Sequence, residues 1–121
     1  MRRDELYLRD IVGACDAIAG FLRDVKKDPF VSNDLLQSAV LQKLIMIGEA
    51  AARVSAPLED RHPEIDWAGI VAFRNIAVHA YFSIQWPIVW VSATQEVPTL
   101  REQILTILKT EWPGGPPRQD F

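Results

Sequence analysis

The sequence predicts an all-α protein that folds as an antiparallel bundle of four to five helices. Apolar residues recur at steps of three and four along most of its length, which is the period of a helix with one buried face. Glycine and proline residues divide the chain into four long segments joined by short links. No pair of alternating segments flanks a tight turn, so nothing indicates a β-hairpin, and no internal repeat is present.

The first two long segments are expected to form amphipathic helices. The first covers about residues 3–27 and should end at Asp28-Pro29, because the residue before a proline avoids helical geometry. The second begins at the N-cap candidates of residues 32–34 and runs to about Ser55. It carries two apolar stripes, which predicts burial on two sides. One side would face the core of the chain, and the other could face a partner subunit.

A polar link over residues 57–63 separates these helices from two more. The third helix is predicted over about residues 66–79. Ser83 can cap the fourth helix, with Pro87 near its first turn, where the missing N–H of proline costs least. Pro98 lies inside the apolar pattern of this helix, so a kink or a break is expected there.

Length and composition predict a single soluble domain. The helical domain should span residues 1–110, and residues 111–121 should form an irregular tail rich in proline and glycine. Apolar residues make up 49% and charged residues 24%, the balance of a globular protein. No run approaches the roughly 20 consecutive apolar residues of a membrane span, and the N-terminus does not resemble a secretory signal. We expect a cytoplasmic protein without a membrane partner.

Charge and cysteine content narrow the function classes. A net charge of −3 and a pI of about 5.3 argue against a broad basic surface for nucleic acid, but leave room for a small local site. The single cysteine, Cys15, excludes an internal disulfide and a cysteine-based zinc site, and is expected to be an inert core thiol. The chain contains no H-E-x-x-H, no glycine-rich phosphate loop and no G-x-S-x-G. No metal site and no cofactor are predicted.

The densest polar group lies within the apolar third helix, at Arg74, Asn75 and His79. Arg74 and His79 are five residues apart, about 140° around an ideal helix, so they would not share one face. Asn75 and His79 are four residues apart and would share one face, so Asn75 could orient the imidazole. On spacing alone a structural interpretation is favoured, in which Arg74 and Asn75 brace the bundle and His79 is half-buried with its hydrogen bonds satisfied.

Two polar residues outside this helix are weaker candidates. Glu49 lies within the apolar second helix, where it could pair with Arg53 one turn later or reach a basic group on another helix. His62 lies in the polar link, where we expect it to be solvated.

The segment from Arg74 to Tyr81 resembles the R-x-x-x-x-H-x-Y motif of HepT-like proteins, a branch of the HEPN superfamily. The resemblance covers about residues 5–105, because further landmarks follow in the family's order, at residues 7–11, 39–50, 63–67, 90 and 97–100. Asp66 stands where proline is usual and should shift only the start of the third helix. Ala80 stands where glycine is common and should restrict the backbone beside the motif.

This resemblance implies a toxin of a toxin–antitoxin module, a homodimeric endoribonuclease that cleaves RNA without a metal cofactor. It implies Arg74 and His79 as catalytic residues, and we assign supporting roles to Asn75 and Glu49 from their positions. The implied partner is a nucleotidyltransferase antitoxin of the MntA type, which attaches AMP to Tyr81. A larger hetero-oligomer with that antitoxin is compatible with this scheme.

Two alternatives stay open. The chain could be a non-catalytic helical module that binds nucleotide or substrate alongside a nucleotidyltransferase, in which case Arg74 would hold phosphate and His79 would not need to titrate. It could also be a purely structural dimeric bundle. The complete set of Arg74, His79 and Tyr81 favours the ribonuclease.

Overall fold

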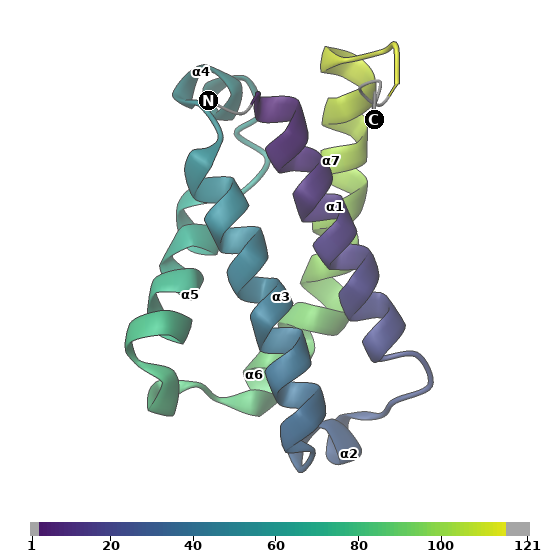
Figure 1. Cartoon of the computed structure of the whole chain (residues 1–121), viewed down its shortest axis with the longest axis vertical. Coiled ribbons are helices and arrows are strands. Elements are labelled where there is room, and N and C mark those ends of the chain that lie inside the picture. Colours follow the sequence, from purple (N-terminus) through teal and green to yellow (C-terminus); the bar gives the residue numbers. More distant parts are fainter. Residues whose placement is uncertain (1–2, 116–121) are drawn as a thin grey trace, which may run out of the picture.

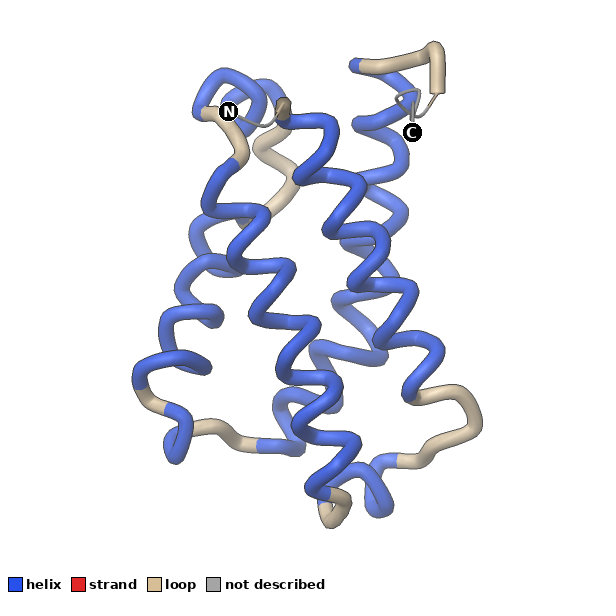
Figure 2. The backbone as a smooth tube through the Cα atoms, viewed as in Figure 1, coloured by secondary structure: helices blue, strands red, loops and turns tan. Residues whose placement is uncertain are grey.

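The computed structural model describes residues 3–115, and every regular element within this range is helical (Figure 1). The elements in chain order are α1 (Asp4–Phe21), α2 (Lys27–Val31), α3 (Asp34–Arg53), α4 (Ala56–Arg61), α5 (Trp67–His79), the 3₁₀ turn η1 (Tyr81–Ser83), α6 (Trp86–Val91), the π turn η2 (Ser92–Glu96) and α7 (Val97–Glu111). The loops are short and lie at the ends of the helices (Figure 2). The predicted all-α bundle is confirmed, with the short helices α2 and α4 added to it.

The first predicted helix is divided in two. α1 ends at Phe21 and α2 begins at Lys27, so the expected continuous helix over residues 3–27 is wrong at its C-terminal end. Between them Asp24 has a φ of 60°, a left-handed conformation that cannot continue a helix and turns the chain. Pro29 does not end a helix. It lies in the first turn of α2, where backbone N–H groups have no partner within the helix, so a residue that lacks an N–H is tolerated.

Two long helices begin as predicted. α3 follows Asn33, whose side chain accepts a hydrogen bond from the Leu36 amide at 3.0 Å. α5 follows Asp66, whose side chain accepts one from the Gly69 amide at 3.0 Å. Asp66 therefore supplies the N-cap of α5 itself. The polar link over residues 57–63 is more ordered than expected, because most of it belongs to α4.

The last long helix is continuous from α6 through η2 to α7. Gln85, and not Ser83, is its N-cap residue, while Pro87 lies in the first turn as predicted. The kink or break expected at Pro98 takes the form of η2, which directly precedes the turn that holds this proline. Proline has no N–H to donate and its ring crowds the preceding turn, so one wider turn accommodates it.

α3 is the central helix of the bundle (Figure 1). It packs against α1 on one side and α5 on another, and α7 packs against α1, whereas α5 and α7 make almost no direct contact. Among the described helices, α3 has the length and composition of a membrane span, but its packing between α1 and α5 is that of a core helix. This packing buries most residues of its two apolar stripes within the chain.

The core is built from apolar side chains of α1, α3 and α7. Its fully buried members include Leu8, Ile11, Ile18, Val40, Ile104 and Ile107. Cys15 is 1% exposed, and burial raises the pKa of its thiol to about 12, so the predicted inert core thiol is confirmed. At one end, Phe30 of α2 packs against Trp86 and Trp90, with ring centroids 6.3 and 5.4 Å away.

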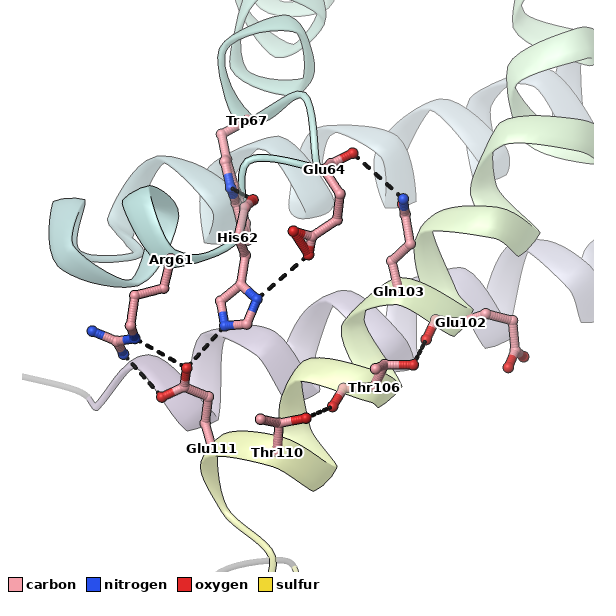
Figure 3. A network of polar contacts seen from close by, with 9 residues as sticks. All are labelled: Arg61, His62, Glu64, Trp67, Glu102, Gln103, Thr106, Thr110 and Glu111. Carbon is pink, nitrogen blue, oxygen red and sulfur yellow. Dashed lines mark hydrogen bonds and ion pairs between the residues drawn. The ribbon is translucent and has the colours of Figure 1, made fainter.

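A polar network ties α4 and the link after it to the last turn of α7 (Figure 3). Arg61 donates from Nε and Nη2 to the Glu111 carboxylate at 3.0 and 2.9 Å. His62 Nε2 lies 2.9 Å from Glu111 Oε2, and its Nδ1 lies 3.4 Å from Glu64 Oε2. Hydrogen bonds from Arg61 and then His62 lower the pKa of Glu111 to about 2. The prediction of a solvated His62 is wrong, because its side chain is 14% exposed between two carboxylates.

Candidate functional site

Gly48 of α3 allows α5 to come close enough to lay Arg74 on the α3 backbone. A Cβ at position 48 would lie 2.3 Å from Arg74 Cβ, 2.8 Å from Arg74 Cγ and 3.3 Å from the carbonyl oxygen of Ile70. Carbon atoms that are not bonded to each other pack at about 3.5–4.0 Å, so any side chain at this position would push the helices apart. The glycine therefore determines where the arginine lies.

Glu49, the next residue of α3, holds the guanidinium of Arg74. Arg74 Nη1 donates a hydrogen bond to Glu49 Oε1, and Arg53 Nη2 lies 3.9 Å from Glu49 Oε2. Both alternatives considered for Glu49 therefore apply. The Arg74 and Glu49 side chains are 22% and 42% exposed, and a pair this open to solvent contributes about 1 kcal/mol or less to folding. Its main effect is to orient the guanidinium.

The Arg74 side chain also carries a polar atom that folding leaves unsatisfied. Its Nε is buried and has no hydrogen-bond partner among the described residues. An unpaired buried polar group costs about 1–3 kcal/mol. The ion pair with Glu49, worth about 1 kcal/mol or less, is no larger than this cost, so it does not by itself account for Arg74. A residue kept at such a cost is a candidate for function.

His79 is the last residue of α5, and its side chain is exposed. Arg74 and His79 differ in their surroundings as their spacing predicted, because Arg74 packs on α3 while His79 lies at the open end of the helix. Asn75 is exposed as well, and no hydrogen bond joins it to His79 in the single chain. The proposed orientation of the imidazole by Asn75 is thus not seen here.

Tyr81 opens the 3₁₀ turn η1, two residues after His79. Ala80 connects α5 to this turn with a φ of −138°, so the position does not require glycine. The ring of Tyr81 lies edge-on to Phe82 and Trp86, with centroid distances of 5.5 and 6.3 Å, and the residue is 41% exposed. The tyrosine and the histidine are therefore both accessible at the same end of α5.

Most of the exposed large apolar side chains fall in one stretch of the chain, from the end of α5 to α6. Of nine large hydrophobic residues exposed in the described part, six lie within residues 76–91, and we call this set the α5-end patch: Ile76, Val78, Tyr81, Phe82, Ile88 and Val91. Phe82 is the most exposed of the six, at 99%. Concentrated apolar exposure of this kind is typical of an interaction surface. By contrast, Leu41 and Gly48 of the second α3 stripe are buried within the chain, whereas Ile45 is partly buried and Ala52 is exposed.

These residues place an arginine and an exposed histidine on one helix of an all-α bundle. A guanidinium can hold a phosphate through two parallel hydrogen bonds. Histidine is the side-chain type that gains and loses a proton near neutral pH. Across residues 3–115, no group of three or more His, Cys, Asp or Glu side chains gathers in a metal-ligating arrangement.

Comparisons with known proteins give the family. Residues 11–107 match the family model described as Ribonuclease HepT-like. The chain is 32% identical over 95 residues to the probable ribonuclease HepT of Thermococcus cleftensis, which covers 78% of this chain and 86% of that protein. It is 28% identical over 104 residues to the predicted RNase MJ1380 of Methanocaldococcus jannaschii, which covers 85% of this chain and 95% of the relative. No solved structure matches it significantly. The chain belongs to the HepT-like ribonuclease family.

Proposed function

We propose that this ribonuclease is the toxin of a toxin–antitoxin module, a metal-independent endoribonuclease that acts on RNA in the cytoplasm. Its active site would combine Arg74 and His79 from two copies of the chain. The observation that carries the proposal is the arrangement on α5, where an arginine held by Glu49 precedes an exposed histidine at the helix end.

The proposed reaction is attack of a ribose 2′-oxygen on the adjacent phosphorus. One group removes the 2′ proton, the bond between phosphorus and the 5′-oxygen breaks, and a second group gives that oxygen a proton. The products are a 2′,3′-cyclic phosphate and a free 5′-hydroxyl. His79 is of the right type for either proton transfer. Arg74 would stabilise the negative charge that grows on the phosphate oxygens in the transition state.

The reaction needs an acid and a base, whereas one chain supplies a single His79. A two-fold dimer would bring two copies of His79 and of Arg74 to one cleft. The α5-end patch supports this proposal, because exposed apolar side chains flank His79 in the sequence, and side chains of this kind are found at the centre of interfaces. We propose that the two copies meet at this patch.

Tyr81 is the proposed point of control. Its hydroxyl would attack the α-phosphorus of ATP, with loss of pyrophosphate, in a reaction catalysed by a nucleotidyltransferase antitoxin of the MntA type. The exposure of Tyr81 supports this role, since a second enzyme must reach it. The attached AMP would add bulk and negative charge two residues from His79 and repel an RNA phosphate.

The experiment that tests the proposal is cleavage of a 5′-labelled RNA by the purified chain. His79→Ala should abolish cleavage, Arg74→Ala should lower its rate by about 10²–10³-fold, and EDTA should have no effect. The chain offers matched controls. His62→Ala removes its other histidine and Arg53→Ala removes the other arginine beside Glu49, and both variants should retain cleavage.

Circular dichroism should show that all four variants stay helical. Cleavage that persists in His79→Ala would remove this histidine from the mechanism. A wild-type chain that binds nucleotide through Arg74 but cuts no RNA would favour the non-catalytic binding module. A monomer at micromolar concentration in sedimentation equilibrium would contradict the composite site.

A further inference from the structure

A groove of about 620 Å³ lies between α5, which packs against α3, and α7, which packs against α1, and these two helices make almost no direct contact with each other. Its floor and walls are apolar and come from all three helices: Leu44, Ile47, Ile70, Phe73, Val97 and Leu100. One end is bridged where Gln103 Nε2 donates to the carbonyl oxygen of Glu64 at 3.4 Å (Figure 3). We call this feature the α5–α7 groove.

The dimensions of the groove suit one additional helix. Its wall along η2 and α7 runs from Ser92 to Gln103, a rise of about 16 Å, which is enough for at most three helical turns. A closed four-helix bundle has four contacts between neighbouring helices, and here the contact between α5 and α7 is the missing one. A short helix laid in the groove would pack against both helices and cover the apolar floor.

The rim of the groove is acidic. Glu64 and Asp66 line one end, Glu96 lines the α7 side, and no lysine, arginine or histidine lines it. None of these three carboxylates is paired with a lysine or arginine among residues 3–115, although Glu64 also faces His62. A rim of this composition attracts positively charged side chains.

The wall of the groove includes the least regular part of the bundle. Ser92, Gln95 and Glu96 all belong to the π turn η2, and all three line the groove. Single π turns are rare within α-helices and occur frequently at functional sites. The irregular turn and the missing helix contact therefore coincide at one place.

We infer that the α5–α7 groove is a docking site for a partner protein that inserts an amphipathic helix of two to three turns, with lysine or arginine beside its apolar stripe. Apolar side chains one turn apart would fill the floor, and the basic side chains would face the rim. The α5-end patch of a second copy is a poor occupant, because residues 75–100, which contain it, include no lysine or arginine. No residue of that patch lines the groove, so the inference is independent of the proposed catalytic roles.

The test uses a synthetic probe of the inferred chemistry. A fluorescein-labelled peptide of about 14 residues, LKKLLKLLKKLLKL, presents an apolar face flanked by lysines. We expect its fluorescence anisotropy to report saturable one-to-one binding to the full chain. A matched peptide with glutamate in place of lysine should bind at least about ten-fold more weakly.

Two sets of variants locate the binding. The triple variant E64Q/D66N/E96Q removes the charge of the rim while asparagine keeps the N-cap of α5, and it should weaken lysine-peptide binding by about ten-fold or more. The control D34N/D60N/E102Q removes three exposed carboxylates that do not line the groove and should bind as wild type. A benzyl maleimide on the thiol introduced by Thr99→Cys should block the groove, whereas the same label on exposed Ser38→Cys should not. Cys15 does not interfere because it is buried.

Three results would overturn the inference. Equal peptide affinity of the two triple variants would remove the acidic rim from recognition. Unchanged binding to the labelled Thr99→Cys variant would place the peptide elsewhere. If the wild type self-associates and the label at position 99 abolishes this association, the occupant of the groove is a second copy of the chain.

Discussion

At the scale of single residues, two glycines inside helices should respond in opposite ways to alanine. Gly48→Ala places a Cβ against Arg74 and should lower the free energy of unfolding by about 1–3 kcal/mol, the usual cost of overpacking. Gly13→Ala is the matched control, because nothing lies within 4 Å of its added Cβ. It should stabilise the protein by about 1 kcal/mol through the better helix propensity of alanine. Urea denaturation measures both changes, and stabilisation by Gly48→Ala would contradict the close contact.

The two tyrosines of the chain allow a direct test of the modified residue. Tyr81→Phe keeps the ring and its contacts with Phe82 and Trp86 but removes the hydroxyl acceptor. It should fold normally and gain no AMP when incubated with ATP, Mg²⁺ and the nucleotidyltransferase. Tyr7→Phe, the control, should gain AMP like the wild type. Intact mass decides the matter, and a mass increase in Tyr81→Phe would move the acceptor to another residue.

The sequence predicted which residues are chemically interesting better than it predicted their partners. The spacing of Arg74 and His79 correctly indicated different faces of one helix. The hydrogen bond from Arg74 to Glu49 joins residues of two helices that are 25 positions apart in the chain. Spacing within one helix therefore does not predict it. The place of His62 in a polar link predicts exposure to solvent, and this prediction fails because its carboxylate partner Glu111 lies 49 residues later in the chain. The roles proposed for these residues in catalysis stay predictions.

At the scale of elements, the N-cap of α5 should contribute measurably to stability. Asp66→Ala removes the hydrogen bond to the Gly69 amide and should cost about 1 kcal/mol. Asp66→Asn keeps a side chain of the same length with an acceptor oxygen, and it should cost much less. Urea denaturation midpoints of the three proteins measure the difference. Equal losses in both variants would show that the charge of Asp66, and not its hydrogen bond, supports the helix.

Helix starts were easier to predict than helix ends in this chain. Asn33 and Asp66 are N-caps because their short side chains reach an amide three residues later, a local rule that sequence reveals. The end of α1 depends on the left-handed conformation of Asp24, which an apolar pattern does not encode. The apolar pattern does not predict the π turn η2 either. Pro98 signals an irregularity, but how a helix accommodates it depends on packing.

At the scale of the whole molecule, the network around Glu111 should make the stability of the fold depend on pH in the acidic range. The pKa of Glu111 is lowered to about 2 in the folded chain, from a reference value of 4.5. Its carboxylate therefore stabilises the fold fully above about pH 5, and this contribution is lost as the pH falls through 4.5 towards 2. The difference in urea midpoint between wild type and Glu111→Gln should be larger at pH 6 than at pH 3. A difference that does not change with pH would show that Arg61 and His62 do not recognise the charge.

The sequence also predicted the class of the fold but not which helices would touch. The helical period identifies an apolar face without naming its neighbour. It therefore leaves open a partner subunit on one side of α3, whereas in the structure α3 packs against both α1 and α5 of the same chain. For the same reason the lack of contact between α5 and α7 had no signal in the sequence. The boundary at residue 110 between domain and tail stays a prediction, and residues 116–121 of that tail lie outside the described range.

The open side of the bundle has a consequence for the helix that carries Arg74. α3 is the one long helix against which α5 packs extensively in the described fold, whereas α1 packs against both α3 and α7. We therefore expect the release of α5 alone to need less free energy than unfolding of the core. Amide protons in the middle of α5 should exchange with deuterium through this local opening, well before those of α1 and α3. Such exchange would place the arginine on a segment that detaches and returns while the rest of the bundle stays folded.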